Sequence, residues 1–456
     1  MGKLVTTSTP LLFQSKLLCF SLTYLFLSLF LAFFTSLSST TKCRFRSSPS
    51  DPLQFPLFNY PQSYAQHKHP IPTIQSSCNS PVFFSDYGFV LDEIRRITEG
   101  SSWDDLKDLR YIQENGNGGS FGMNYSVEKR MSYFDYRDGG IEIPCGFFKK
   151  FPIGDSDRIA MESCTGLVVV SAIFGDHDKI RQPKGLGFRT LDHACFYMFV
   201  DEITLKQFRY HNLLSRKTKE MRIGVWRIVK VLSEELYENP AMNGVIPKYL
   251  VHRMFPNSKY SIWVDAKIQL VVDPLLLLYS LVIKEDADMA VSKHPFYVHT
   301  MEEAMATARW KKWWDVDSLR VQMETYCENG LQPWSSNKHP YPSDVPDSAI
   351  ILRKHGVASN LFSCLLFNEL EAFNPRDQLP FAFVRDQMNP KIKINMFDVE
   401  VFEHVASEYR HNIKQGGSDQ TQPARTKWAS PDLLANGVSH TKCERYLAEM
   451  WGESEE

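Results

Sequence analysis

The sequence lacks the cysteine and histidine spacings of a structural zinc site. Its nine cysteines include no C-x-x-C pair and no Cys/His cluster at zinc spacing. Neither sign of charge dominates, because 51 Lys and Arg stand against 53 Asp and Glu, without a long block of one sign in the central region. These absences count against a zinc-stabilised domain and against a nucleic-acid partner.

Several enzyme and repeat signatures are also missing. The chain contains no H-E-x-x-H motif, no G-x-S-x-G motif and no repeat of 20 to 50 residues. It has no series of long hydrophobic segments that would make it a multi-pass membrane protein. Zinc proteases, serine hydrolases of the α/β-hydrolase type, solenoids and multi-pass enzymes are therefore not indicated.

One hydrophobic run is present near the start, from Leu17 to Phe34, and it is uncharged. Its length is just above the shorter end of what crosses about 30 Å of hydrocarbon. A cleaved signal peptide is the alternative, but the run exceeds the usual hydrophobic region of such peptides, and Thr35-Ser36-Leu37 is a poor cleavage site. We expect residues 1–16 to be a cytoplasmic tail and 17–34 a signal anchor.

The orientation of this anchor does not follow from flanking charge, because lysines and arginines lie on both sides of it. Asn124-Tyr125-Ser126 is the only N-x-[ST] sequon in the chain. We expect Asn124 to be glycosylated and the C-terminal bulk to be lumenal, in a single-pass type II arrangement. The short anchor suits the thinner membranes of the early secretory pathway.

Composition divides the rest of the chain into four parts. Residues 35–80 are rich in Pro, Ser, Gln and His, which is typical of a disordered stem, and residues 413–456 predict a mostly disordered tail. We expect residues 81–158 to form a less periodic lead-in subdomain and 159–412 to form the main domain. In a lumenal domain Cys78, Cys145 and Cys164 are candidates for disulfides, whereas Cys195 and Cys364 lie in apolar runs that favour buried free thiols.

Within the main domain the patterns alternate between strand and helix, which predicts an α/β fold with a mostly parallel central sheet flanked by helices. Apolar runs predict strands at 167–174, 194–200, 260–264, 288–291 and 348–352. Periodicity predicts helices over 221–239 and 301–327. The tryptophans at 310, 313 and 314 fit a buried helix face better than a sugar-stacking surface.

Polar residues follow four of these strands. In parallel sheets ligands bind beyond the carboxyl ends of the strands, so these positions are the first candidates for a site. The candidates that we take from them for ligand binding are Asp176, Asp201, Asp265, Lys267 and His294. Solvated loop caps are the alternative for any single one of them.

Five blocks, taken in order, resemble a known plant family: 167–178, 194–202, 255–267 (FPNSKYSIWVDAK), 293–295 and 376–381 (RDQLPF). The family contains a mucilage-related hexosyltransferase and a turgor-related alkaline ceramidase, and the resemblance spans roughly residues 80 to 412. It implies a GT-A-like nucleotide-sugar domain and a Golgi single-pass membrane protein.

The resemblance implies roles for particular residues. A GT-A enzyme needs a strand-end carboxylate to hold Mn²⁺ or Mg²⁺ on the departing diphosphate, and Asp265 stands in that place as metal ligand and catalytic residue. The usual D-x-D becomes Asp265-Ala266-Lys267, so Lys267 either supplies part of the cationic charge itself or only pairs with Asp265.

Asp377, in Arg376-Asp377-Gln378, is the second catalytic candidate, for orienting or deprotonating an acceptor hydroxyl, with Arg376 on the nucleotide sugar. A near-copy, Arg385-Asp386-Gln387, lies nine residues on, and either motif fits the role.

Three functions remain open at this level. The first is hexosyl transfer from a nucleotide sugar to a glycan acceptor by a Golgi membrane protein. The second, implied by the resemblance, is ceramide hydrolysis, for which the sequence offers no recognisable catalytic motif. The third is a non-catalytic lumenal scaffold, because the D-x-D motif is incomplete.

Overall fold

The computed structural model describes residues 16–41, 48–64, 70–72, 84–100, 109–112, 125–137, 139–146, 151–214, 220–232, 236–310, 312–410 and 443. Asn124, the predicted glycosylation site, lies outside these residues.

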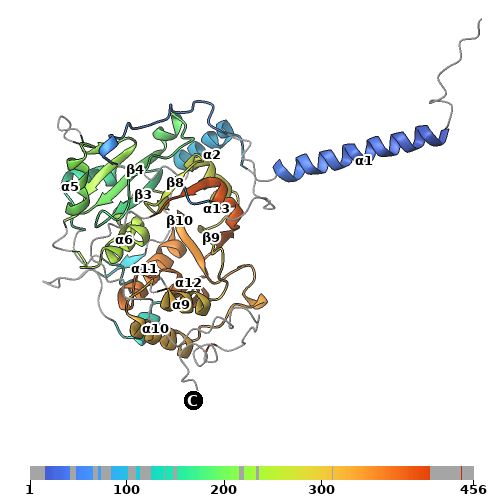
Figure 1. The fold of residues 1–456 in the computed structure, drawn as a ribbon. Helices are drawn as coiled ribbons and strands as arrows, with labels where there is room; N and C mark the ends of the chain where they lie inside the picture. Colours follow the sequence, from blue (N-terminus) through green and yellow to red (C-terminus); the bar gives the residue numbers. More distant parts are fainter. Residues whose placement is uncertain are drawn as a thin grey trace, which may run out of the picture.

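A mixed sheet of eight strands forms the centre of the domain (Figure 1). In spatial order its strands are β11 (Ile394–Phe397), β9 (Met289–Lys293), β10 (Pro346–Lys354), β7 (Tyr260–Val264), β3 (Leu167–Ile173), β4 (Ala194–Val200), β6 (Trp226–Lys230) and β5 (Arg222–Ile223). Only β10 and β5 run antiparallel to their neighbours in this sheet. The predicted α/β fold with a mostly parallel sheet is confirmed.

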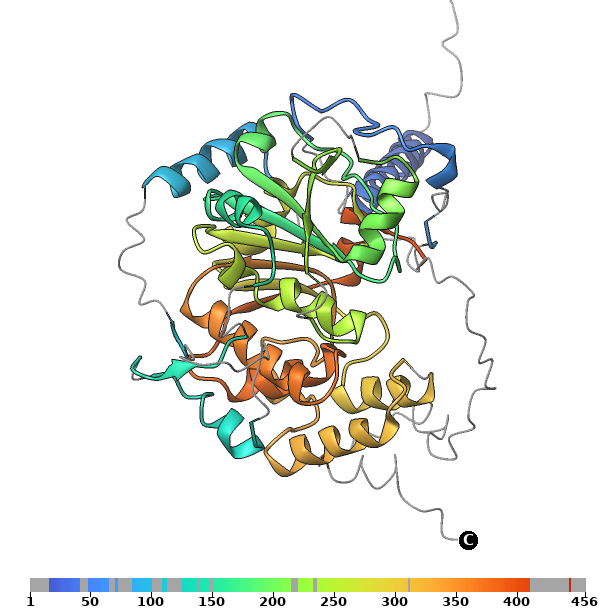
Figure 2. The same cartoon turned by 90° about the vertical axis from the view of Figure 1, so that its left-hand side faces the viewer.

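Helices cover both faces of this sheet (Figure 2). Both faces need cover because the side chains of β3 point alternately to one face and the other. Val168 and Val170 pack into one hydrophobic core, and Val169 and Ile173 pack into the other. The first core includes α6 (Pro240–Tyr249), α9 (Thr300–Arg309), α10 (Val316–Glu328), α11 (Val357–Ala372) and α12 (Gln378–Gln387). The second includes α2 (Tyr87–Gly100), α5 (Glu202–Tyr210), α8 (Pro274–Leu278) and α13 (Val399–Val405).

Smaller elements complete the described part of the chain. The short helices are α3 (Val127–Met131), α4 (Asp155–Glu162) and α7 (Val251–Met254). Two further two-stranded sheets pair β1 (Arg110–Tyr111) with β2 (Glu142–Ile143), and β8 (Ile268–Leu270) with β12 (Ala406–Glu408).

The helix predicted over 221–239 is wrong, because this segment contains β5 and β6. A tight turn joins the two strands, with Gly224 at φ +60, and a Cβ there would lie 2.1 Å from Oε1 of Gln182. The Gln182 side chain donates to the Ile223 carbonyl and accepts from the Val225 amide. A bound side chain and a glycine turn therefore outweigh the helical spacing of the apolar residues.

The single helix predicted over 301–327 is two helices. Asp315 caps α10 by accepting a hydrogen bond from the Ser318 amide at 3.0 Å, so the chain restarts after α9 ends. Trp310 and Trp314 lie in this break and are 65% and 77% exposed. The interpretation of these tryptophans as a buried helix face is therefore wrong.

Parts of the predicted stem and lead-in belong to the folded domain. Tyr64 is 1% exposed, and its hydroxyl accepts from the Ile180 amide, so the expectation of a structureless 35–80 is wrong for this part. Residues 84–100 pack into one core through α2, whereas Phe134 stacks edge-on against Phe383 in the other. The lead-in residues 81–158 thus contribute to both cores instead of forming a subdomain of their own.

Three disulfides are present among the described residues: Cys145–Cys364, Cys164–Cys195 and Cys327–Cys443. The prediction of free thiols at Cys195 and Cys364 is wrong, because each lies beside a partner brought close by the fold. The tail from 413 is described only at Cys443, which its disulfide ties to α10.

The hydrophobic run near the start is helical, within α1 (Lys16–Thr41), and Phe20, Tyr24 and Phe26 on it are each at least 75% exposed. Figure 1 shows α1 extending away from the domain. Among the helices of the described residues, none has the length and apolar character that crossing a membrane requires. The predicted membrane span at 17–34 is therefore not supported by the structure.

Candidate functional site

A cavity of about 600 Å³ lies at the edge of the sheet where β3 and β7 end and β10 begins. Asp265 to Lys267 line it from the end of β7, and Asp347 and Ser348 from the start of β10. Lys248 enters from α6, and Arg376 to Gln378 from the turn before α12. The site predicted beyond the carboxyl ends of the strands thus coincides with a cavity.

Asp265 is held by its neighbours on the strand and on α6. Its Oδ1 accepts a hydrogen bond from Trp263 Nε1 at 2.6 Å and lies 3.5 Å from Lys248 Nζ. The Asp265 amide donates to the Ala349 carbonyl at 2.8 Å, which joins the ends of β7 and β10. The side chain is 27% exposed, so its carboxylate reaches the cavity.

Asp377 forms a buried ion pair with Lys248, at 2.7 Å between Oδ2 and Nζ. Tyr249 and Ser348 also donate to this carboxylate through their hydroxyls, each at 2.8 Å. Burial alone would raise the pKa of Asp377, but the Lys248 ammonium and these hydrogen bonds hold it below its usual value. Burial would likewise lower the pKa of Lys248, but the two carboxylates raise it. Both groups are therefore charged at neutral pH.

Lys267 and Asp347 are two further charged groups of the cavity lining. Lys267 Nζ lies 2.9 Å from Glu408 Oε1, and Asp265, Glu408 and Asp347 together raise its pKa against the effect of burial. Burial raises the pKa of Asp347 to about 6, although the nearby Lys267 acts in the opposite direction. Asp347 is thus the carboxyl of this lining whose charge changes in mildly acidic solution.

Arg376 lines the cavity, whereas His294 does not. Arg376 Nη2 pairs with Glu303 Oε1 at 2.6 Å, and His294 Nε2 lies 3.9 Å from the other oxygen of the fully buried Glu303. His294 also accepts from the amides of Phe296 and Tyr297 through Nδ1, and burial lowers its pKa to about 4. It is therefore a neutral residue behind Arg376.

Asp176 and Asp201 are not brought to the cavity, although the neighbouring His177 and Asp178 line it. Asp201 caps α5, with its two oxygens accepting from the amides of Thr204 at 2.8 Å and Gly175 at 2.7 Å. The Asp176 amide donates to the Thr204 hydroxyl, and its side chain is buried. For Asp201 the geometry favours the loop-cap alternative, and neither carboxylate lies where it contacts a ligand in the cavity.

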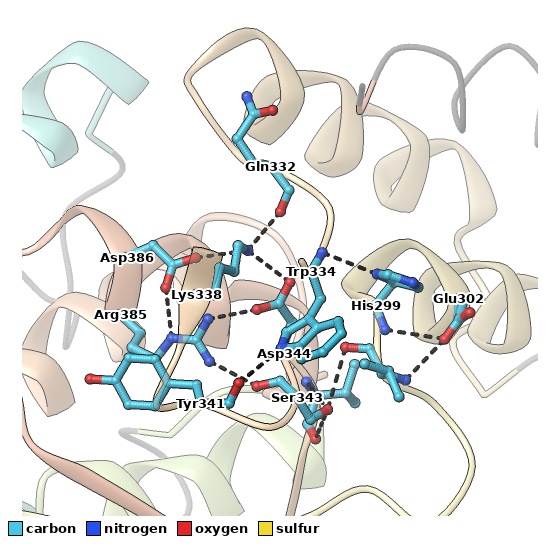
Figure 3. A network of polar contacts seen from close by, with 12 residues as sticks. His299, Glu302, Gln332, Trp334, Lys338, Tyr341, Ser343, Asp344, Arg385 and Asp386 are labelled. Atoms are coloured by element: carbon cyan, nitrogen blue, oxygen red, sulfur yellow. Dashed lines mark hydrogen bonds and ion pairs between the residues drawn. The ribbon is translucent and has the colours of Figure 1, made fainter. Parts of the chain in front are cut away.

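The two Arg-Asp-Gln motifs lie at opposite ends of α12. Arg376-Asp377-Gln378 lines the cavity that contains Asp265, whereas Arg385-Asp386-Gln387 lines a different one. Figure 3 shows Arg385 and Asp386 of the second motif. This separation favours Asp377 over Asp386 as the partner of Asp265.

Sequence reasoning did not find four residues of this site: Lys248, Tyr249, Asp347 and Ser348. The helix that contains Lys248 and Tyr249 had a usable signal in the sequence. Asn239 is an N-cap that accepts from the Ala241 amide, and Pro240 occupies the first helical position, so together they mark the start of α6. Asp347 and Ser348 precede a strand, so a search confined to strand ends passes over them.

The residues present do not fit a divalent ion held by the protein. The Asp265 carboxylate already faces the ammonium of Lys248 and lies within the field of Lys267. Across the described residues, metal-ligating side chains gather as a trio only at Cys145, His252 and Cys364, where the sulfurs are joined in a disulfide. The cations beside Asp265 are lysines.

Residues 107–411 match the model of the TOD1/MUCI70 glycosyltransferase-like domain, and the chain belongs to this family. Two relatives come from Arabidopsis thaliana. Alkaline ceramidase TOD1 is 59% identical over 99% of this chain and 100% of its own length. Probable hexosyltransferase MUCI70 is 36% identical over 70% of this chain and 57% of its own length.

Solved structures with detectable similarity include mouse xyloside xylosyltransferase 1, at 9% identity and a TM-score of 0.28, over 51% of this chain and 85% of that one. The bifunctional glycosyltransferase WbbM matches at 9% identity and a TM-score of 0.27, over 51% of this chain and 39% of that one.

Proposed function

We propose that this protein transfers a hexosyl group from a nucleotide sugar to a glycan acceptor. The observation that carries the proposal is the meeting of two lysines, Lys248 and Lys267, with Asp265 and Asp377 in one cavity at the carboxyl edge of the sheet. The family description, glycosyltransferase-like, supports the same class of reaction.

The lysines would act on the leaving group. As the bond from the anomeric carbon to the diphosphate breaks, negative charge grows on the diphosphate oxygens, and fixed ammonium groups stabilise that charge. Lys248 and Lys267 thereby take the part that Mn²⁺ or Mg²⁺ plays beside a complete D-x-D motif. Arg376, at the same cavity, adds a third cation that is partly neutralised by Glu303.

Asp377 would act on the acceptor. Its carboxylate is ionised, so it can accept a hydrogen bond from an acceptor hydroxyl and orient it. Its lowered pKa makes it a weak base, so it would take up the proton only once the hydroxyl oxygen has begun to bond to the anomeric carbon and has become strongly acidic. Asp265 would hold hydroxyl groups of the donor, because its carboxylate reaches the cavity while its Oδ1 is fixed by Trp263.

Calorimetric titration of the full chain with a panel of nucleotide sugars tests the proposal. We expect one sugar nucleotide to bind, with binding weakened in Asp265→Asn and unchanged in Asp386→Asn. If binding survives 10 mM EDTA, a large excess over trace metal, the result agrees with lysines in place of the ion. If EDTA abolishes binding, a divalent cation is needed at the diphosphate after all. If no nucleotide sugar binds, the transferase proposal is wrong.

Ceramide hydrolysis is the second candidate, because a relative that is 59% identical over nearly the whole chain is named an alkaline ceramidase. Release of sphingosine and fatty acid from ceramide, assayed on the same preparation at alkaline pH, separates it from sugar transfer. Hydrolysis that persists in both Asp265→Asn and Asp377→Asn would place that activity outside this cavity or in a contaminant. A preparation with neither activity and no donor binding would favour the lumenal scaffold.

We further propose that the domain resides in the Golgi lumen, attached through residues 17–34. Three disulfides favour an oxidising compartment, and the sequon at Asn124 fits a lumenal face. Protease protection in sealed microsomes, with an Asn124→Gln variant to remove the glycan shift, is the test. Digestion of the domain without detergent would overturn this topology, and release of the protein by carbonate washing would overturn the attachment.

A further inference from the structure

A second cavity, of about 650 Å³, lies at the other end of α12 from the candidate active site. Two segments line it, one from Gly330 to Tyr341 and the other from Arg385 to Lys391. It contains the near-copy motif Arg385-Asp386-Gln387, for which the proposed reaction has no use. Figure 3 shows the polar network beside it, including Arg385 and Asp386.

A network of matched charges forms the wall. The Arg385 side chain is fully buried and donates to Asp344 at 2.6 Å and to Asp386 at 2.7 Å. Lys338 lies 2.8 Å from the same two carboxylates (Figure 3). Two cations and two carboxylates thus satisfy each other, and they fix the loop that contains Lys338 to the end of α12. Arg385 is fully buried and the Lys338 side chain is 12% exposed, so these cations offer little open surface to a phosphate or another multivalent anion.

The lining also offers aromatic and amide groups. Trp334 donates from Nε1 to the Tyr341 carbonyl at 2.9 Å, which fixes the indole in the cavity wall, and Tyr341 lies under the Arg385 guanidinium at 4.3 Å. Gln387 Nε2 is buried and has no hydrogen-bond partner within the described part of the chain. An unmet buried amide donor costs about 1–3 kcal/mol, so the Gln387 amide gains by turning from this buried position toward a ligand that brings an acceptor.

These features together describe the chemistry that recognises a saccharide. Sugar rings present apolar C–H faces that pack on aromatic side chains, and hydroxyls that exchange hydrogen bonds with planar amides and carboxylates. Asn337 and Gln332 add further amide groups to the lining beside Gln387. A neutral, polyhydroxylated ligand fits this lining better than an anion or an acyl chain.

The position of the cavity relates it to the candidate active site. Asp377 and Asp386 stand at the two ends of α12, and nine residues of helix at a rise of about 1.5 Å separate them by roughly 14 Å. A rigid helix therefore sets the spacing between the two cavities, at a distance that a short oligosaccharide can bridge.

We propose that this second cavity binds an oligosaccharide and holds a part of the acceptor glycan away from the bond being formed. The saccharide site is inferred from the residues that line this cavity. Its assignment to the acceptor rests on the proposed function. Gln387 and Trp334 are its principal ligand-binding residues.

The test is a titration of the full chain with a panel of defined tetrasaccharides, followed by saturation-transfer NMR, with inorganic pyrophosphate and a nucleotide sugar as separate probes. The variants are Gln387→Leu, which keeps the shape of the side chain, and Trp334→Leu, with melting temperature measured for each. Gln207→Leu, on α5 across the sheet, is the matched control.

We expect one tetrasaccharide to bind, with at least tenfold weaker binding in Gln387→Leu and in Trp334→Leu, and unchanged binding in Asp265→Asn and Gln207→Leu. Saccharide binding that is lost in Asp265→Asn but kept in Gln387→Leu would place the glycan in the active-site cavity and overturn the proposal. Pyrophosphate binding that depends on Gln387 would overturn it in favour of an anion site, and so would the absence of binding across the panel. If saccharide binding follows the expected pattern while no nucleotide sugar binds, the saccharide site stands and the transferase proposal fails.

Discussion

Lys248 Nζ lies 2.7 Å from Asp377 Oδ2 and 3.5 Å from Asp265 Oδ1, so one buried ammonium joins the two catalytic candidates. Removing one partner of a buried ion pair leaves an uncompensated charge, which costs about 3–5 kcal/mol. Any variant at these positions therefore needs its stability and its activity measured on the same sample.

Asp265→Asn should weaken binding of the nucleotide sugar by about tenfold, equal to ~1.4 kcal/mol, if the carboxylate holds hydroxyl groups of the donor. The amide keeps an oxygen that can accept from Trp263 Nε1, and Lys248 keeps Asp377 as its closer partner, so the melting temperature should change little. Calorimetry reads the affinity. If Asp265 only neutralises Lys248 and Lys267, removing its charge should instead strengthen binding of the anionic diphosphate, and that result would remove it from the donor contacts.

Lys267→Ala should weaken donor binding, because it deletes one of two ammonium groups assigned to the diphosphate. Added Mn²⁺ or Mg²⁺ should not restore the affinity. The control is Lys393→Ala, which removes an exposed lysine paired with Asp286 on the surface. Full rescue by metal would show that lysine does not replace the ion.

Asp377→Asn should lower turnover by roughly 10²–10⁴-fold, the usual contribution of general acid–base catalysis, while donor affinity stays nearly constant. The pKa of Asp377 is below its ordinary value in the folded protein, so its ionised form also stabilises the fold near neutral pH. That stabilisation is present above the ordinary pKa of the carboxyl and is lost as the pH falls through the depressed value.

The competing interpretation of Asp377 is purely structural, and it predicts that activity falls only in proportion to the folded fraction. Melting temperature and turnover measured on one preparation separate the two interpretations, with Asp286→Asn, at an exposed surface ion pair, as the control. An active and well-folded Asp377→Asn protein would exclude the catalytic role.

Donor binding should depend on pH through Asp347, whose pKa burial raises to about 6. As the pH falls from 7 to 5 the carboxyl becomes neutral, the cavity gains one positive charge, and binding of a nucleotide sugar should tighten severalfold. The diphosphate of a sugar nucleotide is a diester and keeps its charge over this range. Asp347→Asn should remove most of this change, and a His177→Gln background shows whether the histidine that also lines the cavity takes part. A pH dependence that persists in Asp347→Asn would assign it elsewhere.

The same raised pKa acts on stability with a definite sign. The folded protein binds the Asp347 proton more tightly than the unfolded chain, so the free energy of unfolding should decrease as the pH rises through about 6. In Asp347→Asn this decrease should become smaller, which urea unfolding at pH 5 and pH 7 can measure. Part of it should remain, because burial also raises the pKa of Asp273 to about 6.

Much of the fold is predictable from local patterns. Strands buried on both faces are apolar along their whole length, and β4 and β7 begin and end where their apolar runs do. The β5–β6 hairpin is not predictable in this way, because the side chain that secures its turn belongs to Gln182, far away in the sequence. The prediction of free thiols at Cys195 and Cys364 was wrong for the same reason. The apolar residues around a cysteine in the sequence do not show which other cysteine the fold brings beside it.

The candidate site was only half predictable, and strand direction explains the other half. Residues after parallel strands meet at one edge of the sheet, which located Asp265 and Lys267. An antiparallel strand presents its beginning at that edge, so Asp347 and Ser348 of β10 join the site from the opposite end. Asp201 shows that an acidic residue after a strand does not by itself indicate a ligand site, because such a residue can instead cap the following helix.

The disulfides impose an order on biosynthesis. Cys164 and Cys195 are 31 residues apart, whereas Cys145 must wait for Cys364 over 219 residues, and Cys327 for Cys443 over 116. At about 5–20 residues per second, Cys145 spends roughly 11 to 44 s without its partner during translation. If the domain folds in the oxidising lumen proposed above, this thiol is exposed throughout that time to the nearer Cys164 and Cys195. Correct pairing in this chain thus depends on how quickly the first strands fold around Cys164 and Cys195, and on isomerases that reverse wrong bonds to Cys145 before the C-terminal half arrives.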